Sequence, residues 1–238
     1  GKSGQKNMDG KSRLLENALI KMKILNMPEA VSDQQRSESE TSWRWLGWMH
    51  PVMPFVIWLP VASAAIIWGT IAWQLSAVEV ALHGVSALLT WTLLEYVLHR
   101  WLFHPPESWG NFGRLVHSIH RKHHDQPHDE VFALVPPVNA AVVLLFLTGI
   151  FSLVVSARGL AVFIGVFLLG YLFYEFLHLA FHHRKPRTVF GRFLHTHHMR
   201  HHASGDAGNY GVSSPLWDWL LGTYIGAGNT VSNGNGAL

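Results

Sequence analysis

The stretch GLAVFIGVFLLGYLFYEFLHLAF, residues 159–181, decides the fold class of this chain. Its only charged side chain is Glu175, and about 20 apolar residues suffice for a helix to cross the hydrocarbon core of a bilayer. Three more apolar stretches of similar length lie at 51–75, 78–98 and 131–157. Buried helices of a soluble core are the alternative, but four such lengths in one small chain argue against it. The sequence therefore predicts an all-α integral membrane protein with four transmembrane helices.

The composition supports a membrane protein and excludes several other classes. Of the 238 residues, 49% are hydrophobic and only 14% are charged, whereas soluble domains carry about 25% charged residues. The chain has no cysteine, so disulfide scaffolds, thiolate metal sites and thiol catalysis are excluded. A net charge of +3 is too small to indicate a nucleic-acid partner.

The basic residues predict the orientation of the chain. Of 18 Lys and Arg residues, all except Arg158 lie in 1–50, 99–130 and 183–202. Four membrane crossings place these three regions on the same side, and the positive-inside rule assigns that side to the cytosol. We therefore expect the histidines described below to lie on the cytosolic side.

The domain organisation follows from the same pattern. We expect a polar N-terminal tail over residues 1–42, which either forms an amphipathic helix on the membrane surface or stays frayed in solution. A membrane domain over 43–226 and a flexible C-terminal tail over 227–238 complete the chain.

Histidine is the residue type that points to a chemistry. Fifteen of the 17 histidines lie between residues 99 and 128 or between 178 and 202. All of these except His128 form four clusters, or boxes: HRWLFH at 99–104, HSIHRKHH at 117–124, HLAFHH at 178–183 and HTHHMRHH at 195–202. Offsets of three and four residues place side chains on one face of a helix. Stray or snorkelling histidines explain one such box, but not four at matching positions.

Imidazole binds Fe, Zn, Cu and Ni, and eight or more ligands exceed what one ion uses. The boxes therefore indicate two metal ions, and neutral ligands favour redox chemistry with O₂ over hydrolysis, with zinc left open. Glu95 and Glu175 precede His99 and His178 by one turn, so either acid is a candidate to orient its histidine.

These boxes, in this order, resemble the fatty acid hydroxylase and sterol desaturase superfamily of membrane di-iron enzymes. The likeness runs over residues 94–224 and includes the C-terminal segment NYGVSSPLWDWLLGTY at 209–224. Within the superfamily, the chain is most similar to the fatty acid 2-hydroxylases that act on sphingolipid acyl chains. This resemblance implies four membrane helices under a cytosolic helical cap that holds a His-rich di-metal site.

The resemblance also implies a ligand set. It consists of His99, His104, His120, His123, His124, His178, His182, His198, His201 and His202. Tyr174 and Glu175 match a tyrosine–acid pair near the metals, in which the family usually has aspartate. His117, His195 and His197 are extra histidines that either shift the ligand register or act behind the ligands. His183 lies about 100° from His182 on a helix and is left out.

The implied reaction is O₂-dependent hydroxylation of a lipid acyl chain at two iron ions, at the 2-position of a fatty acyl group on a sphingolipid. Zinc can replace iron in a purified sample, because divalent affinities do not favour iron. The haem signature of a fused cytochrome b5 domain is absent, so we expect a separate electron donor such as cytochrome b5 or ferredoxin. The implied location is the bacterial inner membrane, or the endoplasmic reticulum in a eukaryote.

Two alternatives stay open on the sequence. One is a sterol, carotenoid or other lipid oxidase or desaturase of the same superfamily, which the spacing of the boxes does not distinguish. The other is a non-catalytic membrane metal-binding protein or a transporter. Transporters place polar groups near the bilayer midplane, and these apolar stretches contain almost none. The sequence does not determine the oligomeric state.

Overall fold

The computed structural model describes residues 50–129, 133–204 and 207–226, and these residues contain helices and loops but no strand. They belong to two compact units, one ending at Arg184 and the other beginning at Lys185. The predicted tails, 1–42 and 227–238, lie outside the described residues. The all-α prediction is confirmed for the part of the chain that the structure describes.

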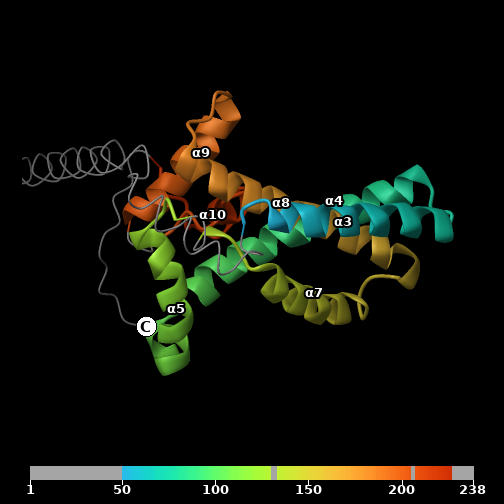
Figure 1. Ribbon diagram of the computed structural model, residues 1–238, viewed down its shortest axis with the longest axis horizontal. Coiled ribbons are helices and arrows are strands. Elements are labelled where there is room, and N and C mark those ends of the chain that lie inside the picture. Colours follow the sequence, from blue (N-terminus) through green and yellow to red (C-terminus); the bar gives the residue numbers. More distant parts are fainter. Residues whose placement is uncertain (1–49, 130–132, 205–206, 227–238) are drawn as a thin grey trace, which may run out of the picture. The chain divides into compact units, whose positions relative to one another are not determined.

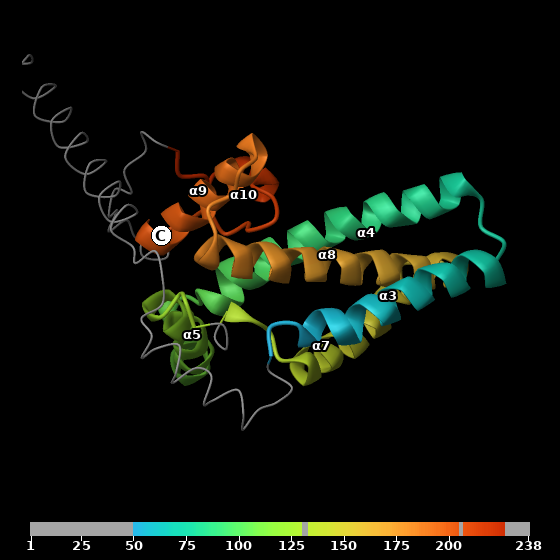
Figure 2. The same cartoon turned by 45° about the horizontal axis from the view of Figure 1, so that its top comes forward.

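The first unit is built on three long apolar helices. They are α3 (Met53–Ala72), α4 (Ala77–Val97) and α8 (Ala157–His183), and they lie side by side in both views (Figures 1 and 2). The helical stretch that begins with α4 continues to Phe103, and all three are long and apolar enough to cross a membrane. They correspond to three of the four predicted spans.

The predicted fourth span contains a shorter helix, α7 (Pro137–Phe151). Its 15 residues extend about 22 Å, less than the roughly 30 Å of a bilayer core. Pro137 occupies the first turn and Pro136 has an extended ψ of 135°, so the helix cannot extend further toward the N-terminus. A fourth membrane crossing therefore stays a prediction.

Small residues let the helices of this unit approach closely. A Cβ atom at Gly165 of α8 would lie 2.7 Å from the carbonyl oxygen of Ala62 in α3. A Cβ atom at Gly170 would lie 2.7 Å from the indole of Trp91, which belongs to the apolar core formed by α3, α4 and α8. Close backbone approach at small residues is the usual means of packing helices in lipid, where the hydrophobic effect contributes little.

The chain changes direction after α4. The π-helical segment η1 (Leu98–Phe103) and the 3₁₀ turn η2 (Glu107–Trp109) lead into α5 (Gly110–Asp125). Gly110, with φ of +57°, makes the turn that starts α5. Helix α5 projects at an angle to the three long helices (Figure 2). It carries the second histidine box near its C-terminal end.

The second unit contains the fourth box. Helix α9 (Val189–Ser204) carries its histidines, and a loop after residue 207 leads to the short helix α10 (Leu216–Leu220). The loop contains two positive φ angles, at Gly208 and Asn209. These angles turn the chain sharply just after α9.

Candidate metal centre

Four histidines of the first unit converge between η1 and α5. We call them the η1–α5 group: His99, His104, His120 and His124. One ring nitrogen from each lies within 4.8 Å of the others. The Nε2 atom of His120 is 3.2 Å from Nε2 of His99 and 3.0 Å from Nε2 of His124. Nitrogen donors this close fit a shared cation better than a set of independent surface histidines.

The π-helical segment explains how the first box reaches this group. His99 and His104 are five residues apart, and on an α-helix that offset turns one side chain about 140° from the other. In η1 the amide N–H of His104 donates to the carbonyl of His99, so the two residues are one π turn apart. Their ring centroids are 5.1 Å apart. π-Helical turns are often found at functional sites, and here the turn aligns two potential ligands.

Three other histidines form the α5–α8 group: His123, His178 and His182. All three are buried. The Nε2 atoms of His123 and His178 are 2.8 Å apart, and the ring centroids of His123 and His182 are 4.7 Å apart. On α5, consecutive residues His123 and His124 point to different groups. Adjacent positions on a helix differ by about 100°, so one helix supplies both groups.

Burial favours the neutral form of His120 and His123 on α5. Burial lowers the pKa of His123 well below its usual value, and the neighbouring His178 lowers it further. Burial and then His99 lower the pKa of His120 in the same way. Neutral imidazole is the metal-binding form, so the donor set fits a metal ion.

A main-chain carbonyl fixes the tautomer of His178. Its Nδ1 atom lies 2.9 Å from the carbonyl oxygen of Ala133, which can only accept. Nδ1 therefore carries the proton, and Nε2 keeps its lone pair facing His123. Histidine ligands are commonly oriented by a hydrogen bond of this kind from the second ring nitrogen.

Side chains of α8 hold the segment that supplies this carbonyl. The backbone N–H of Val135 donates to Oε1 of Glu175 at 3.0 Å, and the hydroxyl of Tyr171 donates to the carbonyl of Val135 at 3.5 Å. The ring of Tyr174 stacks on His178, with centroids 5.4 Å apart. Glu175 thus contacts the chain that orients His178, whereas Tyr174 contacts the histidine ring itself. Glu95 is buried in α4, one turn before His99.

In the second unit, a main-chain carbonyl again orients a buried histidine. His198 and His202 lie one turn apart on α9, with ring centroids 4.6 Å apart. The Nδ1 atom of His201 lies 2.8 Å from the carbonyl oxygen of Gly208, so this proton is also fixed by a main-chain acceptor. All three histidines are buried.

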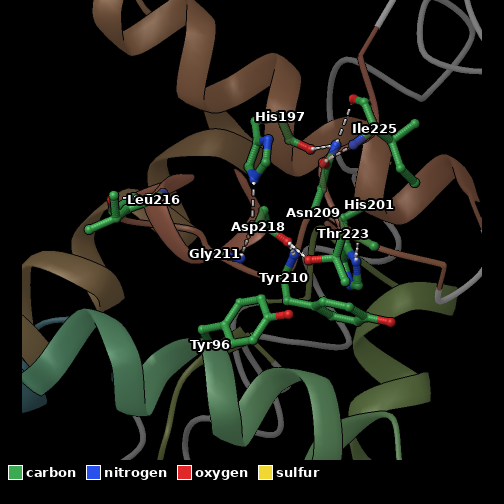
Figure 3. A network of polar contacts seen from close by, with 12 residues as sticks. Tyr96, His197, His201, Asn209, Tyr210, Gly211, Leu216, Asp218, Thr223 and Ile225 are labelled. Atoms are coloured by element: carbon green, nitrogen blue, oxygen red, sulfur yellow. Dashed lines mark hydrogen bonds and ion pairs between the residues drawn. The ribbon is translucent and has the colours of Figure 1, made fainter. Parts of the chain in front are cut away.

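Asp218 joins α9, the loop and α10 of this unit (Figure 3). Its carboxylate accepts from the backbone N–H groups of Tyr210 and Gly211, at 2.9 and 2.8 Å. It also accepts from the Thr223 hydroxyl at 2.7 Å and from Nε2 of His197 at 3.1 Å. Four donors satisfy a fully buried charge, which would otherwise be costly.

Asn209 makes a second connection in the same network (Figure 3). Its amide donates to the carbonyls of His197 and Ile225, and its Oδ1 atom accepts from the N–H of Ile225. Sequence reasoning selected the segment that contains Asn209 and Asp218 but gave neither a role. A buried acid in an apolar segment was the available signal for Asp218.

The extra histidines have contacts of their own. His197 donates to Asp218, and Nδ1 of His117 lies 3.0 Å from the carbonyl oxygen of Phe103. The ring of His183 lies beside His128, with centroids 6.0 Å apart. Within the first unit, His117 and His183 belong to neither group. His195 lies on α9, at the start of the fourth box.

Comparison with known proteins gives the same family by three routes. The family model described as fatty acid hydroxylase matches residues 84–223. A dihydroceramide fatty acyl 2-hydroxylase, FAH2 of Arabidopsis thaliana, is 34% identical over 173 residues, covering 71% of each protein. The fatty acid 2-hydroxylase of Rattus norvegicus is 34% identical over 146 residues, which cover 59% of this chain and 39% of the relative.

A solved structure of full-length scs7p, in which only the hydroxylase domain is visible, is also similar. Its TM-score is 0.70 at 27% identity, and the match covers 77% of this chain and 69% of that one. The matched family model includes all four histidine boxes and the Asp218 network.

Proposed function

This chain belongs to the fatty acid hydroxylase family of oxidoreductases, and on that premise we propose that it hydroxylates carbon 2 of a fatty acyl chain carried by a ceramide-type lipid. The observation that carries the proposal is the pair of histidine groups, η1–α5 and α5–α8, at one end of the apolar helices. The substrate class is supported by relatives that are named as dihydroceramide and ceramide fatty acyl hydroxylases.

The ten-histidine ligand set is part of the proposal. The seven histidines of the two groups would bind two iron ions, and His198, His201 and His202 would complete their coordination. Iron would supply the O₂-activating redox chemistry that no amino-acid side chain provides. The reaction balances as R–H + O₂ + 2e⁻ + 2H⁺ → R–OH + H₂O, so two electrons must reach the site per turnover, and the proposed source is a separate electron-transfer protein.

The chain's own residues prepare the site for that chemistry. The carbonyl groups of Ala133 and Gly208 hold His178 and His201 in one tautomer, so these rings need no reorientation to bind a metal. Tyr174 stacks on His178 and restrains its ring. Glu175 fixes the segment that contains Ala133 through the N–H of Val135. We propose that these residues act as positioning residues.

The same proposal includes the membrane topology. Helices α3, α4 and α8 would cross the bilayer, and α7 would provide the fourth apolar segment, since Val142, Leu145 and Phe146 expose their side chains. The distribution of Lys and Arg would place the histidine groups on the cytosolic side. An acyl chain dissolved in the bilayer could then reach the site without leaving the lipid.

Lipid mass spectrometry of a host that expresses the chain tests the activity. The intact protein should produce acyl species with one added oxygen, and fragmentation should place the hydroxyl on carbon 2. The double variant His123→Ala, His124→Ala removes one ligand from each group and should abolish this product. His183→Ala is the matched control, because it removes a neighbouring histidine that belongs to neither group.

The outcomes separate the alternatives. A product that lacks two hydrogens would identify a desaturase, and an oxidised sterol would identify a different substrate. If no lipid changes although protein, metal, donor and O₂ are present, the hydroxylase proposal is wrong. Metal analysis of the purified protein should find two ions per chain, and at most one in the double variant.

A further inference from the structure

The second unit exposes a group of large apolar side chains that its histidine site does not use. Val189 and Phe190 at the start of α9 are 77% and 63% exposed. Trp219, Leu220 and Leu221, around the end of α10, are 53%, 64% and 48% exposed. We call these five residues the apolar patch. Water-facing surfaces of soluble units seldom gather side chains of this size.

The patch is continuous across the two helices. Phe193 follows Val189 and Phe190 by one turn, so the three share a face of α9. The ring of Phe193 lies 6.1 Å, centroid to centroid, from that of Trp219. Trp219 in turn packs against Tyr224, with centroids 5.6 Å apart. The α9 and α10 parts of the patch therefore form one surface.

Four basic residues lie close to Val189 and Phe190 in the sequence. Arg184, Lys185, Arg187 and Arg192 are all exposed. No acidic residue occurs between Glu175 and Asp206, so this charge is uncompensated along the sequence. Tryptophan and apolar side chains next to Lys and Arg are typical of surfaces that lie at the boundary of a bilayer.

The connection to α8 limits how far the patch can be from a membrane. α8 is long and apolar enough to cross a bilayer, and it ends at His183. Only residues 184–188 separate it from Val189, and a fully extended chain of that length reaches about 20 Å. If α8 crosses the bilayer, the start of α9 lies within that reach of the C-terminal end of α8, which itself emerges on the side of the histidine groups.

We propose that the apolar patch inserts into the headgroup region of an anionic membrane surface, with its basic neighbours on the lipid phosphates. The partner is the lipid bilayer that holds α8. A symmetric contact with a second copy is disfavoured, because it would place the four basic residues of each chain against their own duplicates. The proposal concerns attachment alone and does not depend on which reaction the chain catalyses.

Single-cysteine spin labelling tests the proposal directly, because the chain contains no cysteine. Val189→Cys and Leu220→Cys place labels on the patch. Ser204→Cys, at the far end of α9, serves as the reference outside the patch, and Ile67→Cys on α3 serves as the lipid-facing reference. Each labelled protein is reconstituted in vesicles of phosphatidylcholine with phosphatidylglycerol. Accessibility to apolar O₂ is then compared with accessibility to a water-soluble nickel chelate.

The proposal expects the two patch labels to favour O₂ over the nickel chelate severalfold more than the label at Ser204 does. It is overturned if the patch labels are as accessible to the nickel chelate as to O₂, because the patch then faces water. It is also overturned if both reagents are excluded, because the patch is then covered by protein, either a second copy or a partner. Full metal content in each labelled variant confirms that the second unit has folded.

A second experiment removes charge and tests the role assigned to the basic residues. The double substitution Arg184→Gln, Arg187→Gln, made in the Leu220→Cys protein, should shift the label toward the nickel chelate. Vesicles of phosphatidylcholine alone should shift it in the same direction. If neither change moves the label, the basic residues do not bind lipid phosphate and that part of the proposal fails.

Discussion

His178 in the first unit and His201 in the second are oriented by the same device, but the segments that carry their acceptors are held differently. Each histidine directs Nδ1 at a main-chain carbonyl, of Ala133 or of Gly208. The segment with Ala133 is held at Val135, whose N–H donates to Oε1 of Glu175 and whose carbonyl accepts from the Tyr171 hydroxyl. The loop after Gly208 is held by Asp218, which accepts four hydrogen bonds.

The difference separates two roles for a buried acid. Asp218 has no acceptor capacity to spare, so its role is to hold the loop, α10 and α9 together. Glu175 lies in an apolar helix and accepts one hydrogen bond from the main chain, at Val135. An acid buried in an apolar helix is costly, so it is expected to have a use beyond holding one N–H.

The largest effect is expected for Asp218→Ala. Each buried donor that loses its acceptor costs about 1–3 kcal/mol, and four such losses are comparable with the total stability of many proteins. We expect the second unit to lose cooperative unfolding, measured by thermal denaturation in detergent. Thr223→Val removes one of the four donors together with its bond, and should cost only about 1 kcal/mol. If Asp218→Ala and Thr223→Val lose the same stability, Asp218 does not hold the second unit together through four hydrogen bonds.

Gly208→Ala should have the next largest effect. Gly208 has φ of +146°, and a Cβ atom there would lie 2.3 Å from the carbonyl oxygen of Thr223. The strain should displace the carbonyl that orients His201 and cost about 1–3 kcal/mol. Ala133→Gly is the matching change in the first unit and should retain the hydrogen bond to His178. Bound metal per chain measures both, and the comparison fails if Ala133→Gly loses as much metal as Gly208→Ala.

A smaller effect is expected at Glu175, where two substitutions separate its roles. Glu175→Leu leaves the N–H of Val135 without its acceptor, at a cost of about 1–3 kcal/mol, and should lower bound metal. Glu175→Gln keeps an acceptor oxygen and should preserve metal content. If Gln lowers product formation while metal is retained, the carboxyl group acts beyond positioning. If Glu175→Gln loses as much metal as Glu175→Leu, Glu175 does not position His178 by accepting from the N–H of Val135.

The smallest effect is expected at Tyr174. Tyr174→Phe keeps the ring that stacks on His178 and should leave bound metal unchanged. Tyr174→Ala removes the stacking, which is worth about 0.5–1.5 kcal/mol beyond the buried area. The thermal midpoint of each variant checks this order, and a large loss in Tyr174→Phe would assign the role to the hydroxyl group instead of the ring.

The length of α7 shows that a run of apolar residues does not by itself predict where a helix begins and ends. The run 131–157 is as apolar as the other predicted spans, yet its helix occupies only Pro137–Phe151. Pro136 and Pro137 limit one end, and Ser156 caps the start of α8 at the other by accepting from the N–H of Gly159. Mean hydropathy describes a whole window of residues. The ends of a helix depend on single residues, such as a proline or a capping serine, which have little effect on that mean.

The sequence by itself determined the class of the protein and the helical spacing of histidines within boxes two and three, whereas the ligand set stays a prediction. Apolar length and helical spacing are local properties of the chain, so α3, α4 and α8 and the offsets within boxes two and three were predictable. The first box was different, because an offset of five residues aligns His99 and His104 only through the π-helical turn of η1.

The two carbonyl acceptors were not predictable either. Ala133 is 45 residues from His178, and Gly208 reaches His201 through a turn that Asp218 and Asn209 hold. Which proton a histidine keeps depends on its neighbours in space, and only the tertiary structure decides which neighbours those are.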